Sequence, residues 1–231
     1  MKNKTYKILV FVLYLLSLFI FLFCLKVRLS SGVYLYTRTR ILLLVIACLF
    51  IYLSGYILVK KLEFSKKILN INLFIYFIVY TITIITLTLF DEIFGRQGLV
   101  IVNWNKELLN SYLKYSFNII PFNTIKLYIN GYINGYVNLK VFSMNILGNL
   151  VALMPYGMFI PLMFKRINKY YKFLILMIIL VIGIELLQFI TLSGSCDIDD
   201  LILNVMGASI IYYICQIKYI KQLINKIFLF K

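Results

Sequence analysis

Apolar side chains dominate this chain in six long runs, which short polar and basic segments separate. The runs cover residues 8–25, 41–59, 68–90, 141–164, 173–192 and 201–217. A helix needs about 20 apolar residues to cross a hydrocarbon core about 30 Å thick. Because each run approaches that length, the pattern predicts six membrane-spanning helices. The first run is longer than the apolar core of a signal peptide, so we expect an uncleaved helix.

The composition supports the same fold class. Hydrophobic residues make up 63% of the 231 positions, and the mean hydropathy is +0.95. A water-soluble core could not bury so much apolar surface. The sequence therefore predicts an all-α polytopic transmembrane helix bundle of about six helices, in a multi-pass protein of the plasma membrane.

The formal net charge of +16 reflects lysines and arginines that lie almost entirely between the apolar runs. In membrane proteins such residues accumulate in the cytoplasmic segments. With a cytoplasmic N-terminus, 15 of the 24 basic residues lie inside and nine outside. This bias predicts that both termini are cytoplasmic. Because the basic residues then serve to orient the protein in the membrane, we expect no nucleic-acid partner.

The chain divides near residue 91, where three runs with few polar side chains give way to a more polar half. We expect two N-terminal helices in residues 1–67, which form an extension. A transmembrane domain follows in residues 68–217, with an outer loop at 91–140, and a basic cytoplasmic tail covers 218–231. In the outer loop, Pro121 favours an extended or turn geometry at Ile120.

Polar side chains of the last three runs recur three or four residues apart, so that each pair shares one helix face. The pairs are Asn145 and Asn149, Glu185 and Gln188, and Asp200 and Asn204. In the predicted orientation all six lie in the outward half of the bilayer. Because a carboxylate in lipid is costly, such groups face a bundle interior or a wet cavity. We therefore predict that three helices converge on a polar pocket near the outer surface.

Three aspartates directly precede the sixth run. Asp197 is the predicted N-cap, and Asp199 and Asp200 fall in the first turn, where the positive end of the helix dipole stabilises carboxylates. Successive side chains of a helix point in directions about 100° apart. We therefore expect Asp200 to point into the bundle and Asp199 to point toward the loop or a neighbouring helix. The candidate binding residues are therefore Asn145, Asn149, Glu185, Gln188, Asp197, Asp199, Asp200 and Asn204.

The fourth run has its own backbone signals. Pro155 and Gly157 should kink this helix, because proline removes a backbone donor and clashes with the preceding turn. Gly148, Ala152 and Gly157 are small enough to let another helix approach closely.

The chain has no histidine, which excludes Ser-His-Asp and Cys-His nucleophilic schemes and the commonest metal ligand. Its four cysteines show no metal-ligand spacing, and we interpret them as apolar thiols; a disulfide to Cys196, in the outer turn, stays open. Catalysis would have to use carboxylates, amides, hydroxyls, or a cation held by oxygen ligands.

Four segments of the second half, taken in order, resemble one family. They are NIIPF (118–122), NILGNLVALMPYG (145–157), ELLQ (185–188) and SCDIDDLILNVMG (195–207). In this order and spacing they resemble the VanZ-like membrane proteins, and TLTLFDEIFGRQG (86–98) is similar to the weaker segment before them. The resemblance covers about residues 86–213. It implies an envelope protein of a Gram-positive-like plasma membrane that is linked to lowered susceptibility to teicoplanin and other lipoglycopeptides.

Three functions remain open at this stage. We favour a non-enzymatic protein whose pocket binds a membrane lipid, a lipid-linked cell-wall precursor or the lipoglycopeptide antibiotic. The alternative is an envelope enzyme in which Asp197, Asp199, Asp200 and Glu185 hold Mg²⁺ or Ca²⁺ and act on a lipid phosphate or glycolipid. The second alternative is a transporter, which the lack of two matching halves disfavours.

The predicted orientation can be tested by thiol labelling of intact cells. Cys196 lies in the predicted outer turn, so a membrane-impermeant thiol reagent should modify it when it is reduced. A cysteine introduced at Lys169, in a predicted inner loop, should not react. The reverse labelling pattern would overturn the orientation.

Overall fold

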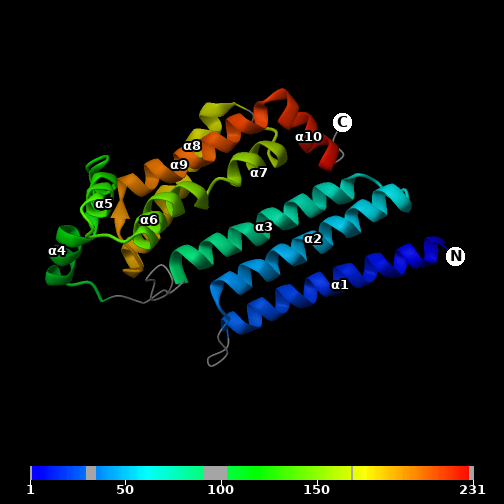
Figure 1. Cartoon of the computed structure of the whole chain (residues 1–231), viewed down its shortest axis with the longest axis horizontal. Helices are drawn as coiled ribbons and strands as arrows, with labels where there is room; N and C mark the ends of the chain where they lie inside the picture. Colours follow the sequence, from blue (N-terminus) through cyan, green and yellow to red (C-terminus); the bar gives the residue numbers. More distant parts are fainter. Residues whose placement is uncertain (1, 30–34, 91–102, 168, 229–231) are drawn as a thin grey trace. The chain divides into compact units, whose positions relative to one another are not determined.

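The computed structural model describes residues 2–29, 35–90, 103–167 and 169–228, and it is almost wholly helical (Figure 1). Within these residues, six helices are long and apolar enough to cross a membrane, which confirms the predicted fold class. The six spans are Asn3–Val27, Thr37–Lys61, Lys67–Leu89, Leu139–Met163, Tyr170–Thr191 and Ile198–Gln216. The side of the membrane on which the termini lie stays a prediction.

The described elements follow one another as a series of helices with two very short strands. They are α1 (Lys2–Leu29), α2 (Thr37–Lys61), α3 (Lys67–Phe90), α4 (Lys106–Tyr115), β1 (Phe117–Asn118), α5 (Asn123–Ile133), α6 (Leu139–Ala152), α7 (Tyr156–Met163), α8 (Tyr170–Thr191), β2 (Cys196–Asp197), α9 (Ile198–Gln216) and α10 (Lys218–Phe228). The predicted basic tail thus contains a helix, α10.

The chain forms two compact units. One consists of Met1–Ile82 together with Gln222–Lys231, and the other of Thr83–Lys221. The boundaries between the units therefore fall within α3 and within α10. The sequence pattern places domain boundaries at residues 67 and 217, and these stay predictions.

In the first unit, one buried amide joins three helices. Asn72 of α3 is only 2% exposed. Its Nδ2 donates to the carbonyl oxygen of Ile51 in α2 at 3.0 Å, and its Oδ1 accepts from the hydroxyl of Tyr14 in α1 at 3.3 Å. Gly55 leaves the space for this amide, because a Cβ there would overlap Nδ2 of Asn72. Interhelical hydrogen bonds of this kind stabilise helix association in a membrane.

In the second unit, the fourth span is broken rather than only kinked. α6 ends at Ala152, and α7 begins at Tyr156. Turn hydrogen bonds join the two, from the amide of Met154 to Val151 and from that of Tyr156 to Leu153. Pro155 has no amide hydrogen to continue the α-helical pattern, so the predicted distortion becomes a complete break.

α9 is the central helix of this unit, because α6, α7 and α8 all pack against it. Gly157 confirms the predicted close approach, since a Cβ there would overlap the carbonyl oxygen of Ala208. Gly148 is not at a close helix approach, because a Cβ there would meet nothing within 4 Å. A second close approach, which was not predicted, lies at Gly207, where a Cβ would overlap the carbonyl oxygen of Leu150.

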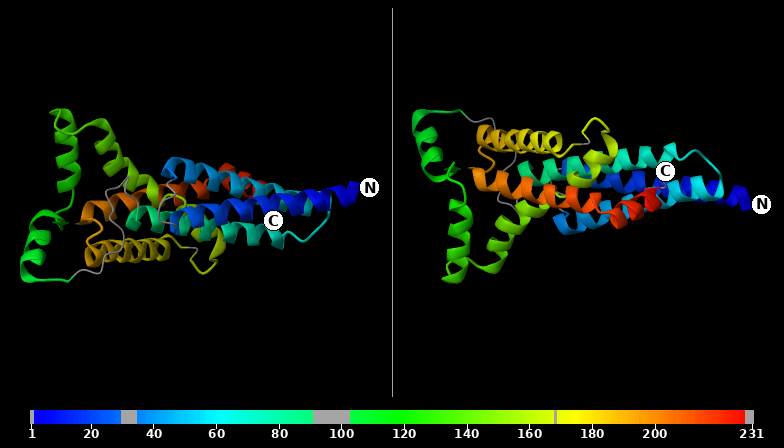
Figure 2. Two further views of the ribbon diagram at one scale, coloured as in Figure 1. Left: turned by 90° about the horizontal axis from the view of Figure 1, so that it is seen from below. Right: turned by 90° about the horizontal axis from the view of Figure 1, so that it is seen from above.

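The predicted outer loop has defined structure from residue 103 onward, and residues 91–102 lie outside the described residues. Ile120 adopts a bend before Pro121, as expected. β1 pairs in parallel with β2, with Phe117 opposite Cys196 and Asn118 opposite Asp197. Figure 2 shows that α5 runs across the direction of α8 and α9 in both views. The described part of this loop, residues 103–138, therefore folds onto the end of the second unit at which α9 begins; it is called the outer segment below, after its predicted side of the membrane.

Gly207 of α9 and Gly148 of α6 have different surroundings, so an added methyl group should affect the stability of the protein differently at the two positions. Gly207→Ala should lower the thermal stability of the detergent-purified protein, because overpacking at Leu150 costs about 1–3 kcal/mol. Gly148→Ala makes the same chemical change where there is free space, so it should leave the melting temperature unchanged or raise it. Equal melting temperatures of the two variants would contradict the close packing of α6 on α9.

Candidate functional site

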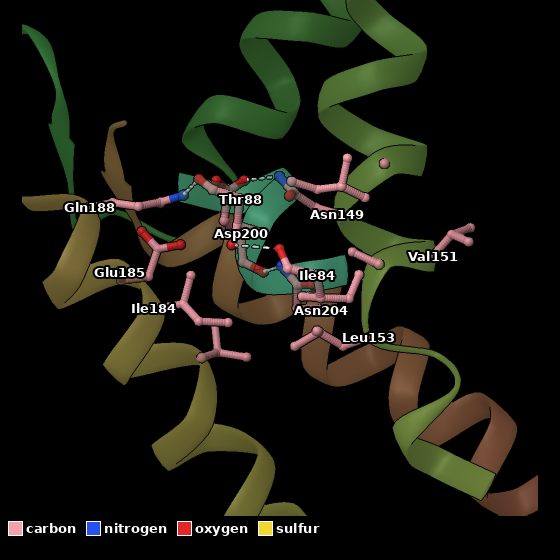
Figure 3. A pocket seen from close by; sticks show the side chains of 14 residues that line it. Ile84, Thr88, Asn149, Val151, Leu153, Ile184, Glu185, Gln188, Asp200 and Asn204 are labelled. Carbon is pink, nitrogen blue, oxygen red and sulfur yellow. Dashed lines mark hydrogen bonds between the residues drawn. The ribbon is translucent and has the colours of Figure 1, made fainter. Parts of the chain in front are cut away.

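A cavity of about 210 Å³ lies within the second unit, between the end of α3 and helices α6, α8 and α9 (Figure 3). Its polar lining residues are Thr88, Asn149, Glu185, Gln188, Asp200 and Asn204. Its apolar lining residues include Ile84, Leu87, Leu153, Val181 and Ile184. The cavity thus combines polar groups from four helices with an apolar wall.

α8 places its two polar cavity residues through one buried stripe. Phe173, Met177 and Val181 are 1% exposed or less, and the same stripe continues to Glu185 and Gln188, which are 7% and 3% exposed. On other faces of α8, apolar residues such as Ile175, Ile179 and Leu186 are exposed, as expected of a helix that contacts lipid. Only the interior stripe changes from apolar to polar, so the polar groups gather at one end of the helix.

Both polar cavity residues of α8 bind a backbone group of another element. Oε2 of Glu185 accepts a hydrogen bond from the amide of Asp197 at 3.0 Å, which ties α8 to the start of α9. Nε2 of Gln188 donates to the carbonyl oxygen of Thr88 in α3 at 3.0 Å. These two hydrogen bonds hold the α8 side of the cavity to β2 and to α3.

Asp200 is the meeting point of α6 and α9. Nδ2 of Asn149 donates to Oδ1 of Asp200, and Nδ2 of Asn204 donates to the backbone carbonyl oxygen of Asp200 at 2.8 Å. Figure 3 shows Glu185 and Asn149 reaching toward Asp200 from opposite sides of the cavity. The predicted shared face of Asp200 and Asn204 is confirmed.

Asp197 caps α9, as predicted, and also binds the outer segment. Its Oδ1 accepts from the amide of Asp199 at 2.8 Å and from Nδ2 of Asn118 at 2.9 Å. Asn118 also donates to the hydroxyl of Thr124 in α5 at 3.0 Å. The short β1–β2 pairing brings Asn118 opposite Asp197, so the strands place this polar contact.

Asp199 is fully buried and caps a different helix, α5. Its two carboxylate oxygens accept from the amides of Phe122 at 2.5 Å and Ile125 at 3.0 Å. Phe122 is the N-cap residue of α5, has φ +64°, and has no side-chain group that could cap the helix. The carboxylate of Asp199 therefore supplies the cap from 77 residues away, where the positive end of the helix dipole favours it.

An aromatic cluster packs beside the turn that precedes α9. Tyr112 of α4 contacts Trp104 and Phe189 with ring centroids 6.1 and 5.1 Å apart, and its hydroxyl donates to the carbonyl oxygen of Gly194 at 2.9 Å. This cluster and the two aspartates hold the outer segment at three separate places.

The acidic groups affect the neighbouring ionisable side chains. Burial raises the pKa of the Cys196 thiol, and the carboxylates of Glu185, Asp197 and Asp200 raise it further. Burial likewise raises the pKa of Tyr128 in α5, with added contributions from Asp200 and Asp197. Since the thiolate is the reactive form, labelling of Cys196 should accelerate as the pH rises toward the raised pKa.

A family model described as VanZ/LLP1 matches residues 77–219, which include every residue that lines the cavity. This chain belongs to the VanZ/LLP1 family. The match covers more than half of the chain and confirms the resemblance that the motifs suggest. No curated protein and no solved structure matches the chain.

Within this VanZ/LLP1 domain, the predicted site residues fall into three groups. Five of the eight line the cavity, namely Asn149, Glu185, Gln188, Asp200 and Asn204. Asp197 and Asp199 lie beside it and bind the outer segment. Asn145 does not line the cavity, and its Nδ2 donates to the carbonyl oxygen of Val141 within α6 at 2.9 Å.

Sequence reasoning missed two contributors to this arrangement in the VanZ/LLP1 domain. Asn118 begins the NIIPF motif, and its position just before a proline turn was an available signal. Thr88 contributes its backbone carbonyl oxygen, which no side-chain pattern could identify.

The arrangement of the carboxylates bears on a metal site. Among the described residues, no three His, Cys, Asp or Glu side chains are grouped so that they could hold one ion. Asp199 is directed toward the amides of α5, whereas Asp200 is directed toward Asn149. The predicted set of Asp197, Asp199, Asp200 and Glu185 is thus divided among different partners, and a role in metal binding stays a prediction.

The cap that Asp199 provides can be tested by replacing its carboxylate. Asp199→Ala leaves two amides of α5 without acceptors, and each hydrogen bond to a charged group contributes about 1.5–3 kcal/mol. Hydrogen–deuterium exchange in residues 117–133 should therefore become faster, while the α6–α9 interface keeps its protection. Glu107→Gln, an exposed carboxylate in the first turn of α4, is the matched control and should change nothing. Unchanged exchange in Asp199→Ala would refute the role of this cap.

Proposed function

We propose that this protein is a plasma-membrane protein of the cell envelope whose cavity binds the polar group of an amphiphile. The observation that carries the proposal is the cavity lining: five polar side chains from α6, α8 and α9 share a cavity with an apolar wall. Binding sites in proteins combine apolar walls with a few convergent polar groups in this way.

The size of the cavity supports binding of part of a larger molecule. Pockets that enclose a drug-sized ligand measure about 300–1,000 Å³, whereas this cavity measures about 210 Å³. A headgroup portion would fit, with the rest of the ligand lying in the surrounding bilayer. This geometry suits a membrane lipid, a lipid-linked cell-wall precursor, or the acyl-bearing lipoglycopeptide teicoplanin, to which the VanZ-like resemblance points.

The chemistry of the lining supports a ligand that donates hydrogen bonds. Glu185 and Asp200 supply carboxylate oxygens, and the amides of Asn149, Gln188 and Asn204 supply further polar atoms. Among the described residues that line the cavity, none is a lysine or arginine. Sugar hydroxyl, amide and ammonium groups are therefore better partners than a bare phosphate. The orientation predicted from the basic residues would open this site to the outer leaflet, where wall precursors are used.

Binding rather than catalysis is favoured by what the acidic residues already do. Asp197 caps α9, Asp199 caps α5, and Glu185 holds the amide of Asp197. The chain also lacks histidine, the usual proton carrier at neutral pH. These roles are structural, and they keep the polar lining in place for a ligand.

A matched pair of asparagines on α6 tests the proposal. Asn149 lines the cavity, and Asn145, one turn earlier, does not. In nanodiscs containing the full-length protein, Asn149→Ala and Glu185→Gln should weaken binding of fluorescently labelled teicoplanin or lipid-linked precursor by about tenfold, the equivalent of about 1.4 kcal/mol. Asn145→Ala should bind as the wild type does. Cells that express the weakened variants should regain susceptibility to teicoplanin at unchanged protein levels.

Gly148→Leu separates loss of binding from loss of folding. A Cβ at Gly148 meets nothing within 4 Å, and this glycine lines the cavity, so a leucine there should fill the space without disturbing the helices. A normally folded Gly148→Leu variant that retains full binding would refute the proposal. Calorimetric titration with Mg²⁺ and Ca²⁺ tests the enzyme alternative: ion binding that Asp200→Asn abolishes, together with ion-dependent turnover of a lipid, would replace the binding proposal.

A further inference from the structure

α10 is an amphipathic helix with a clean separation of apolar and polar residues. With about 100° between successive residues, its apolar side chains cover one half of the helix and its polar side chains the other. The apolar residues are Tyr219, Ile220, Leu223, Ile224, Ile227 and Phe228, and the polar ones are Lys218, Lys221, Gln222, Asn225 and Lys226. The helix contains no acidic residue. All charged residues of its polar half are therefore cationic.

Among the described residues, the exposed fractions differ between the two sides of this apolar half. Ile224 is buried, at 8% exposed. Along the other edge, Tyr219, Leu223 and Ile227 follow one another four residues apart and are 79%, 51% and 38% exposed. An exposed apolar stripe beside lysines is typical of a helix that lies in a membrane interface.

The position of α10 in the chain places it at a membrane surface. The span of α9 ends at Gln216, and α10 begins at Lys218. Its 11 residues extend only about 16 Å, which is too short for another crossing. The helix is therefore held where the hydrocarbon core gives way to headgroups.

The lysines occupy the positions that contact headgroups. Lys226 lies next to Tyr219 around the helix, and Lys221 lies next to Phe228, so lysines border the apolar half on both sides. From these borders a long side chain reaches the headgroup layer while its stem stays on the apolar surface. Each lysine near an anionic leaflet strengthens association about fivefold, the equivalent of about 1 kcal/mol.

We propose that α10 is a binding site for anionic phospholipid. Tyr219, Leu223 and Ile227 insert among the acyl chains, and Lys218, Lys221 and Lys226 contact the headgroups. The occupant is the membrane in which α9 is embedded, because only Ile217 separates α10 from that span and the lysines are complementary in charge to anionic headgroups. This site is separate from the cavity, so it stands or falls independently of the proposed function.

The insertion can be measured with the environment-sensitive fluorescent amino acid Anap in the full-length protein. Nanodiscs of phosphatidylcholine with 30% phosphatidylglycerol provide the anionic surface. Leu223→Anap should be quenched by acyl-chain nitroxide lipids and not by aqueous iodide. Gln222→Anap, the neighbouring polar position, should be quenched by iodide. Quenching of Leu223→Anap by iodide, or by neither agent because a second copy or another protein covers it, would overturn the proposal.

The headgroup preference is measured at Gln222→Anap, which lies between Lys218 and Lys226 around the helix. At the same mole fraction, headgroup-nitroxide phosphatidylglycerol should quench the fluorescence of this Anap at least about fivefold more strongly than headgroup-nitroxide phosphatidylcholine. Replacing Lys218, Lys221 and Lys226 with glutamine should remove the preference. The matched control replaces Lys106, Lys114 and Lys126, in α4 and α5, and should leave it intact. Equal quenching by the two lipids in the wild type would refute the anionic site.

Discussion

The organisation of the VanZ/LLP1 domain depends on one fully buried carboxylate, that of Asp199. A charged group without contact to water is stable only when its oxygens receive strong hydrogen bonds. The amides at the start of α5 provide them, and in return the carboxylate caps a helix that has phenylalanine, in a left-handed conformation, at its N-cap. Each side of this contact thus satisfies a group that would otherwise destabilise the fold, and the outer segment is fixed to the start of α9.

The contacts of the same turn explain why the three aspartates lie so close together in the sequence. The three aspartates bind three different elements. Asp197 contacts β1, Asp199 contacts α5, and Asp200 contacts α6 at the cavity. Glu185 adds α8 by accepting the amide of Asp197. One short turn therefore joins the outer segment to three membrane helices, and the cavity is bounded by side chains whose positions these contacts restrict.

The sequence predicts those features that depend on spacing along one helix. Six spans, the Asp197 cap and the shared face of Asp200 and Asn204 all follow from helical periodicity and local preference. Features that depend on contacts between distant segments were missed. Asn118 acquires its role only through the pairing of β1 with β2, and Gly207 only through the close approach of Leu150. Asn145 and Asn149 looked equivalent, because helical periodicity does not show how far along a helix a cavity extends.

α9 carries opposite chemistry at its two ends. Three aspartates lie at its start, and the lysines of α10 follow its end, about 28 Å further along a helix of 19 residues. Because basic residues concentrate on the cytoplasmic side of membrane proteins, this polarity favours the cavity in the outer leaflet and α10 at the inner one. The two proposed ligands would then belong to different leaflets. An amphiphile that enters the cavity would not compete with the anionic lipid at α10, so the inner contact can anchor the bundle while the outer site exchanges its ligand.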